Sequence, residues 1–217
     1  MSPRDEFNAK TELVISRGQA IPVTDHRYRS LLTPLDVLWT VPHGAPGNDV
    51  AAPPTGLVAD EISKDIGLES LIVLSVVDRY KRLDMNRPAS RSSPYRNAVR
   101  AAIATRTPQY LIDVHSFPDS YAAYSGRDIV ILHTPGVTDR AFLERYALLL
   151  RLASINLGTP KIIEVQNQHQ PVVHDIVAEA RDLGMKPDKV ALIEHNESGD
   201  TTAYGKMNAM AIKALTR

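Results

Sequence analysis

The sequence contains no cysteine, and this absence excludes several kinds of chemistry. Disulfide bonds, a thiol nucleophile and thiolate ligands for zinc all require that residue. Any metal site in this chain must therefore be built from histidine, aspartate and glutamate.

The chain also lacks an excess of either charge, and it lacks long apolar runs. Its 25 basic and 25 acidic residues give a formal net charge of zero, so no bulk field draws it toward nucleic acid or an anionic membrane. No apolar run approaches the roughly 20 residues that span a bilayer. Residues 1–6 carry no apolar signal core. We therefore expect a cytoplasmic protein with neither nucleic acid nor a membrane as a partner.

Strand and helix patterns alternate along most of the chain. This order predicts an α/β domain over 1–217, with a mixed, mostly parallel sheet flanked by helices. The expected strands are 12–16, 37–42, 71–77, 109–114, 129–132, 161–165 and 190–193. The expected helices are 57–67, 94–105, 138–156, 171–183 and 202–215.

Polar side chains follow four of these strands closely. His43 follows 37–42, the Asn86-Arg87 pair comes after 71–77, His115 closes 109–114, and Glu194 closes 190–193. Ligands of open α/β sheets bind beyond the carboxyl ends of the strands. The four segments therefore predict one site, and their residue types indicate a zinc hydrolase.

A catalytic zinc ion takes three protein ligands and keeps one position open. His43 and His115 are the best candidates for two of them, and we expect one Zn²⁺ per chain. The third ligand should be a carboxylate near the start of the helix at 57–67. Glu61 is preferred because its side chain reaches farther, and Asp60 is the alternative.

The Asn86-Arg87 pair has a different chemistry. A guanidinium pairs with a carboxylate through two parallel hydrogen bonds, and an adjacent amide adds a donor. This pair predicts a small acidic substrate, with a structural ion pair between Arg87 and Asp84 or Asp78 as the alternative.

Glu194 is the candidate general base. Its position after an apolar strand predicts a raised pKa, which suits proton transfer near neutral pH. Glu164 competes for this role but lies within the strand 161–165, and Glu197 lies farther into the loop. Of the remaining histidines, His133 could line the pocket, whereas strand alternation turns His195 to the opposite side.

At these residues the sequence resembles the N-formylglutamate amidohydrolase family, which belongs with the zinc carboxypeptidase and aspartoacylase-like amidohydrolases. The similarity covers roughly 37–196. Its specific parts are the Arg-Tyr pair followed by Asp-x-Asn-Arg-Pro, which covers 79–88, and Asp-x-His-Ser, which covers 113–116. The family usually has serine at the position of Gly44 or just before the following glycine.

The resemblance implies a phosphorylase/hydrolase-like fold and zinc-dependent cleavage of an amide bond. It implies His43, Glu61 and His115 as zinc ligands, Asn86 with Arg87 as the substrate clamp, and Glu194 as the general acid and base. The expected substrate is N-formylglutamate, another N-acyl amino acid or a small peptide. The alternative is an inactive binding protein that keeps this fold, and a homo-oligomer is compatible with either function.

Overall fold

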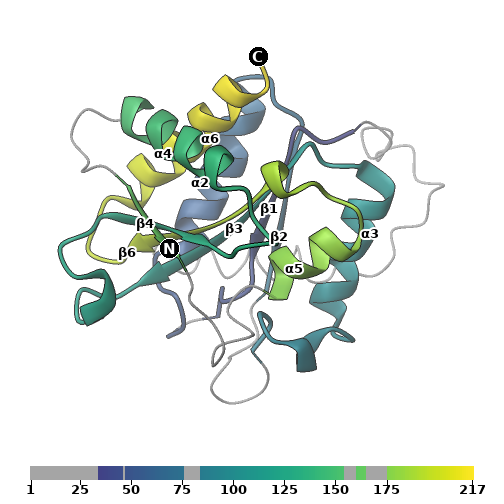
Figure 1. Ribbon diagram of the computed structural model, residues 1–217, viewed down its shortest axis with the longest axis horizontal. Coiled ribbons are helices and arrows are strands. Elements are labelled where there is room, and N and C mark those ends of the chain that lie inside the picture. Colours follow the sequence, from purple (N-terminus) through teal and green to yellow (C-terminus); the bar gives the residue numbers. More distant parts are fainter. Residues whose placement is uncertain (1–33, 46, 76–83, 154–159, 165–174) are drawn as a thin grey trace, which may run out of the picture.

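A six-stranded sheet in the order β2-β1-β3-β6-β4-β5 runs through the centre of the molecule (Figure 1). It is seen in a computed structural model that describes residues 34–45, 47–75, 84–153, 160–164 and 175–217. The strands are β1 (Val37–Val41), β2 (Ser70–Leu74), β3 (Tyr110–Phe117), β4 (Ile129–His133), β5 (Lys161–Glu164) and β6 (Val190–Asn196).

The strands do not all run in the same direction. β1 is parallel to β2 and β3, and β3 is parallel to β6. β4 is antiparallel to β6 and parallel to β5. Four strands, β1, β2, β3 and β6, therefore have their carboxyl ends at the same end of the sheet. The carboxyl ends of β4 and β5 lie at the opposite end, which is called the opposite edge below.

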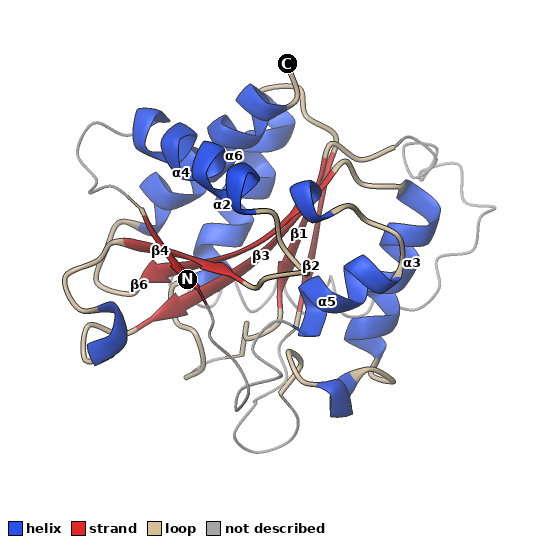
Figure 2. Cartoon of the chain, viewed as in Figure 1, coloured by secondary structure: helices blue, strands red, loops and turns tan. Residues whose placement is uncertain are grey.

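Helices cover both faces of the sheet, as Figures 1 and 2 show. One face carries α2 (Ala52–Asp65), α4 (Arg140–Ala153) and α6 (Thr201–Leu215), and the other carries α3 (Pro94–Arg106) and α5 (Asp175–Asp182). Short 3-10 segments are η2 (Pro88–Ser90), η3 (Ala122–Tyr124) and η4 (Pro187–Lys189). Among the described helices, none has both the length and the apolar character needed to cross a membrane.

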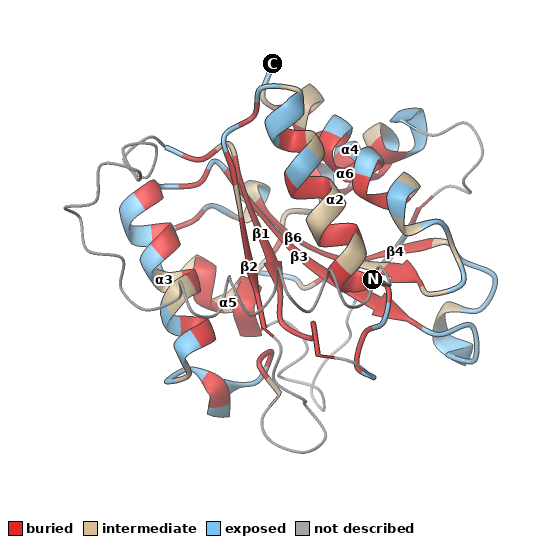
Figure 3. Ribbon diagram, turned by 180° about the vertical axis from the view of Figure 1, so that it is seen from behind, coloured by how far each residue is buried: buried red, intermediate tan, exposed pale blue. Residues whose placement is uncertain are grey.

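The alternation of each strand divides the core into two halves. In β3, Ile112 and Val114 pack on the side of α2, α4 and α6, whereas Leu111 and Phe117 pack on the side of α3 and α5. Figure 3 shows the central strands as almost entirely buried. Among the described strands, β5 alone has exposed residues, Lys161 and Glu164. Side chains at neighbouring strand ends are thus fixed by a rigid, fully packed support.

The expected α/β architecture is confirmed, and most of its elements lie near their predicted positions. Ser93 is the N-cap of α3, where its hydroxyl accepts from the Arg96 amide at 3.2 Å. Asp139 accepts from the Phe142 amide at 2.7 Å, before α4. The expected strand at 12–16 and the expected helix start at Pro171 lie outside the described residues.

One helix boundary differs from the prediction. α2 begins at Ala52 and not at residue 57, because Pro53 fits the first turn of a helix and extends it toward the loop. Asp60 and Glu61 therefore lie in its third turn, away from the amino-terminal end.

Candidate metal centre

Two histidines meet where β1 and β3 end. His43 lies two residues beyond the end of β1, and His115 lies near the end of β3. Their rings are almost perpendicular, at 80°, and their centroids are 4.8 Å apart. Both side chains are buried, with 4% exposure for His43 and 3% for His115.

Asp49 lies between the two rings. Its Oδ2 atom is 2.9 Å from Nδ1 of His43 and 3.1 Å from Nδ1 of His115. The potential ligand atoms of these three buried residues all lie within 4.8 Å of one another. Each histidine therefore presents the same ring nitrogen to one carboxylate oxygen.

Two further carboxylates hold the far sides of the rings. Nε2 of His43 lies 2.7 Å from Oδ1 of Asp84, and Nε2 of His115 lies 3.0 Å from Oδ2 of Asp113. Asp113 is itself fixed by Thr40, whose hydroxyl donates to Oδ1 at 2.6 Å. Carboxylates in this position set the orientation of a ligating imidazole and fix which of its nitrogens carries the proton.

The charges of these groups stabilise one another. Burial alone would lower the pKa of His43, but hydrogen bonds with Asp49 and Asp84 raise it. Burial would likewise lower the pKa of His115, and the charge of Asp113 and the bonds to Asp113 and Asp49 raise it well above its usual value. In return, the two histidines outweigh the effect of burial on Asp49 and lower its pKa. The carboxyl group of Asp84 is held below its usual pKa in the same way, chiefly by His43.

Glu194 borders this cluster from β6. It is the register partner of His115 in the parallel pair β3–β6, so the two residues are neighbours across the sheet. Burial raises its pKa to about 7; the charge of His115 opposes this shift and that of Asp49 adds to it. A carboxyl group with this pKa can both accept and donate a proton near neutral pH.

The grouping of His43, Asp49 and His115 fits a zinc ion. Zinc bonds of about 2.0–2.1 Å in tetrahedral geometry place ligand atoms roughly 3.3 Å apart. The 2.9 Å and 3.1 Å separations in this cluster are close to that value. Two imidazoles and one carboxylate form a common ligand set of catalytic zinc. The outer bonds to Asp84 and Asp113 leave both Nδ1 atoms available as ligands.

The structure places the two predicted carboxylate candidates elsewhere. Glu61 is exposed on α2, and Asp60 accepts from Lys64 at 2.5 Å and from Ser70 at 2.7 Å. Neither belongs to the cluster of ligand atoms, where the carboxylate is that of Asp49. The expectation for Glu61 depended on a helix that starts at residue 57, and the earlier start moves this residue away from the strand ends.

Sequence reasoning gave Asp49 and Asp113 no role in the site, and it named Asp84 only as an alternative ion-pair partner of Arg87, a pair that the structure contains. The signal for Asp113 was present, because in a strand a residue two positions before His115 points to the same face. Asp49 lies in a loop of glycine, proline and alanine, where no periodicity indicates direction. In the sequence, only its separation of six residues from His43 indicated that Asp49 could belong to the site.

Asn86 and Arg87 are neighbours in sequence with different surroundings. Asn86 is buried, its Oδ1 accepts from the Ile176 amide at 3.3 Å, and its Nδ2 lies 3.5 Å from Nε2 of His115. The Arg87 side chain is 48% exposed, and its Nε donates to Oδ2 of Asp84 at 3.0 Å. Through Asp84 this guanidinium is connected to His43, so it lies at the rim of the cluster.

Three other residues considered from the sequence lie away from the cluster. His133 and Glu164 end β4 and β5, at the opposite edge of the sheet, because these strands run against β6. His133 bonds to the Thr138 hydroxyl at 2.9 Å. His195 points to the α6 side, as predicted, where its Nε2 lies 2.9 Å from Nδ2 of Asn208. His26, His169 and His174 lie outside the described residues.

Gly44 permits close packing next to His43. A Cβ atom at this position would overlap the backbone carbonyl oxygen of Ser75 and lie 3.0 Å from the Leu74 side chain. The chain after β1 thus runs directly against the end of β2, and a larger residue than glycine would not fit this backbone path.

Comparison with known proteins shows similarity of structure. No protein-family model matches the chain, and no sequence of a curated protein matches it. Gene product Atu2144 from Agrobacterium tumefaciens has a TM-score of 0.56 and 17% identity, over 87% of this chain and 89% of that one. The N-acetylmuramoyl-L-alanine amidase AmiC2 of Nostoc punctiforme has a TM-score of 0.52 and 12% identity, over 83% and 97%. A metallo-carboxypeptidase from Burkholderia cenocepacia has a TM-score of 0.52 and 12% identity, over 94% of this chain and 67% of that one. The chain therefore shares its fold with these three proteins.

Proposed function

We propose that the protein is a zinc-dependent amidohydrolase. The observation that carries this proposal is the placement of Asp49 between the Nδ1 atoms of His43 and His115, with Glu194 as the strand neighbour of His115. The fold supports the proposal, because an amidase and a carboxypeptidase, two kinds of enzyme that cleave amide bonds, share it. Because one fold can carry many activities, the side chains of the site give the stronger support.

His43, Asp49 and His115 would hold the metal ion. Asp84 and Asp113 would orient the two imidazoles, because they bond to Nε2 of His43 and to Nε2 of His115, respectively. When bound, a zinc ion would polarise the amide carbonyl group and lower the pKa of a coordinated water molecule.

Glu194 would transfer the proton. Its carboxylate accepts a proton from the attacking water molecule and delivers it to the leaving amine nitrogen, so that the side chain returns to its starting state. Both transfers require a pKa near neutrality, and burial provides this for Glu194.

Arg87 would bind the substrate. A guanidinium at the rim of the cluster, 48% exposed, suits a substrate with a free carboxylate. This supports an N-acyl amino acid such as N-formylglutamate, or a small peptide with an acidic end. Asn86 is proposed to complete the clamp from its buried position beside His115.

The catalytic assignment is tested by Glu194→Gln. This variant should keep its zinc content. Its turnover number should fall by ~10²–10⁴-fold or more, because a general base usually contributes a factor in this range. The matched control is Glu164→Gln at the opposite edge of the sheet, which should hydrolyse at the wild-type rate. Full activity in Glu194→Gln would remove this residue from catalysis. Zinc binding without hydrolysis of any N-acyl amino acid by the wild type would indicate a binding protein.

The substrate class is tested by Arg87→Lys. Lysine keeps the charge but cannot form the bidentate pair. Because Arg87 is half exposed, we expect a rise in KM of about 10-fold for carboxylate substrates, the lower end for a bond to a charged group. Amide substrates without a carboxylate should be unaffected. An equal change for both substrate types would assign Arg87 to the ion pair with Asp84 alone.

A further inference from the structure

Asp49 differs from the two histidines in how it is held. His43 and His115 sit at the ends of β1 and β3, whereas Asp49 lies in the loop that leads into α2. The next residue, Val50, is 61% exposed. The side chain of Asp49 is nevertheless buried in the centre of the cluster, with 3% exposure. Something other than a strand must fix this part of the loop.

Glu197 and Ser116 bind the backbone immediately after Asp49. The Val50 amide donates to Oε1 of Glu197 at 3.0 Å, and the Ala51 amide donates to Oγ of Ser116 at 3.1 Å. The Ser116 hydroxyl in turn donates to the same Oε1 atom at 3.1 Å. One carboxylate oxygen thus holds two successive amides, one directly and one through the serine.

These amides belong to the amino-terminal end of α2. The N-cap residue of this helix is Ala51, whose side chain cannot accept a hydrogen bond. The first amides of a helix have no partners inside it, and this end of a helix favours negative charge. The Val50 and Ala51 amides immediately precede the first helical residue, Ala52, so Glu197 and Ser116 hold the chain where it enters α2.

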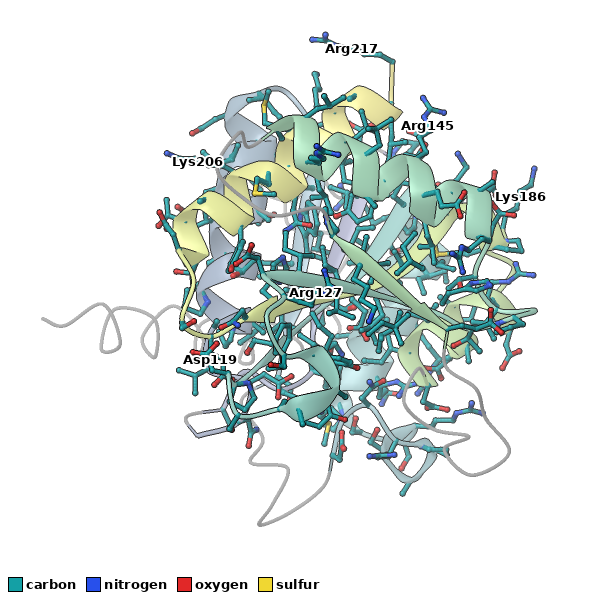
Figure 4. All side chains as sticks on the ribbon, turned by 60° about the vertical axis from the view of Figure 1, so that its left-hand side comes forward. Asp119, Arg127, Arg145, Lys186, Lys206 and Arg217 are labelled. Atoms are coloured by element: carbon teal, nitrogen blue, oxygen red, sulfur yellow. The ribbon has the colours of Figure 1, made fainter. Side chains whose placement is uncertain are left out.

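Glu197 is itself firmly placed. Its amide donates to the Phe117 carbonyl at 3.0 Å, which continues the β3–β6 pairing by one residue. In the preceding residue, Nδ2 of Asn196 donates to Oδ1 of Asp119 at 2.7 Å and to the Arg127 carbonyl at 3.2 Å. Figure 4 labels Asp119 at the lower left of the molecule and Arg127 near its centre.

We propose that Glu197 is a positioning residue of the metal centre, which holds Asp49 between the two histidines by binding the Val50 and Ala51 amides. This inference rests on the proposed metal site and extends it to a residue that contacts neither the ion nor the substrate. Glu197 sets the affinity for zinc by fixing the ligand that lies farthest from a strand, since His115 is within β3 and His43 is two residues beyond β1.

The first test compares zinc affinities, measured by competition with a chromophoric chelator. Glu197→Ala should weaken zinc binding by about 10–100-fold, as is usual for residues that orient a metal ligand. Glu197→Gln keeps an acceptor oxygen and should restore most of the affinity. Ser116→Ala removes the bond to the Ala51 amide but keeps the one between Glu197 and the Val50 amide, so it should weaken zinc binding less than Glu197→Ala does. This variant replaces Glu197→Ala as the test if Glu197→Ala does not fold.

Asp200→Ala is the matched control. Asp200 is a carboxylate at the start of another helix, where it caps α6 by accepting from the Thr202 amide at 2.9 Å and from the Ala203 amide at 3.1 Å. Its loss should lower the melting temperature of the metal-free protein without changing zinc affinity. An equal loss of affinity in Asp200→Ala and Glu197→Ala would reduce Glu197 to a structural cap and overturn the proposal.

A double-mutant cycle connects the effect to Asp49. In an Asp49→Ala background, Glu197→Ala should have no further effect on zinc affinity, and the visible spectra of the two Co²⁺-loaded single variants should change in the same way. If Asp49→Ala weakens binding but Glu197→Ala does not, the proposed metal site stands and the positioning role is wrong. If Asp49→Ala itself leaves the affinity unchanged, the ligand assignment fails, and the role of Glu197 with it.

Discussion

At the scale of single residues, each imidazole of the metal centre lies between two carboxylates. His43 bonds to Asp49 and Asp84, and His115 bonds to Asp49 and Asp113. Both rings thus bond through Nδ1 to the same carboxylate, that of Asp49, and through Nε2 to a carboxylate of their own. This arrangement concentrates negative charge, which favours a bound cation.

His195 provides a contrast, because its environment keeps it neutral. It has 0% exposure, and burial lowers its pKa to about 3. Its Nε2 accepts from Asn208, and Asn208 Oδ1 accepts from the Tyr146 hydroxyl at 2.5 Å. The chain of bonds joins β6 to α6 and α4 through a region of otherwise apolar core.

This environment predicts a pH dependence of stability. The unfolded histidine titrates near 6.5, and the folded one at about 3. Stability is therefore full above pH 6.5 and falls as the pH drops from there toward 3, since only the unfolded chain takes up the proton. For metal-free protein in urea, the free energy of unfolding should fall by about 2 kcal/mol more between pH 7 and pH 5 in the wild type than in His195→Gln.

The comparison with the variant isolates His195. The raised pKa values of His43 and His115 act in the opposite direction, but they are present in both proteins and cancel. Identical pH dependence in the two proteins would mean that His195 takes up a proton in the folded state.

Single residues also show the limit of sequence reasoning. The sequence predicted His43, His115 and Glu194 at neighbouring strand ends, and the structure places them there. Strand periodicity fixes both the end of a strand and the face of each side chain, so such residues can be found. Asp49 could not be found, because it lies in a loop whose next two amides, those of Val50 and Ala51, bind Glu197 and Ser116, which are distant along the chain.

At the scale of elements, the direction of β4 decides which residues join the site. The sequence predicted this strand but not its antiparallel pairing with β6, which is a choice of chain path and not of composition. The reversal carries His133 and Glu164 to the far edge. A His or Glu at the end of a strand therefore lies at the site only if the strand runs parallel to β3 and β6.

A buried ion-pair network joins α3 to α5 behind the site. Arg96 has 0% exposure, its Nε donates to Glu179 Oε2 at 2.8 Å, and its Nη2 lies 2.9 Å from Oδ2 of Asp175. Its Nη1 also donates to the Met85 carbonyl at 3.1 Å, one residue before Asn86. The network thus fixes the segment that carries the proposed substrate clamp.

Arg96→Met should destabilise the protein by about 3–5 kcal/mol, because it removes the fully buried partner of two buried carboxylates, which then keep only the more exposed Arg91 and Arg100. Chemical denaturation measures this loss. The control is Arg100→Met, which removes a bond to Oε1 of the same Glu179 from a side chain that is 30% exposed. It should cost less than about 1 kcal/mol, as is usual for accessible pairs. Equal costs for the two variants would contradict the role given to burial.

At the scale of the whole molecule, the candidate site lies on one face of the sheet only. The face covered by α2, α4 and α6 is apolar apart from the bonded chain of His195, Asn208 and Tyr146. The side chains of Asp113, His115 and Glu194 all point to the other face. Alternation in β3 and β6 fixes this division, and the parallel register aligns His115 with Glu194. Proteins with 12–17% identity share the same overall fold, so this framework tolerates wide change in sequence.

The most direct test of the account is the zinc content of four purified proteins: the wild type, His43→Ala, His115→Ala and His133→Ala. We predict about one zinc ion per chain in the wild type and in His133→Ala, whose histidine lies at the opposite edge of the sheet. His43→Ala and His115→Ala should be folded and nearly free of zinc, because two remaining ligands bind the ion weakly. Full zinc occupancy in His43→Ala and His115→Ala, or its loss in His133→Ala alone, would contradict the metal centre described for this protein.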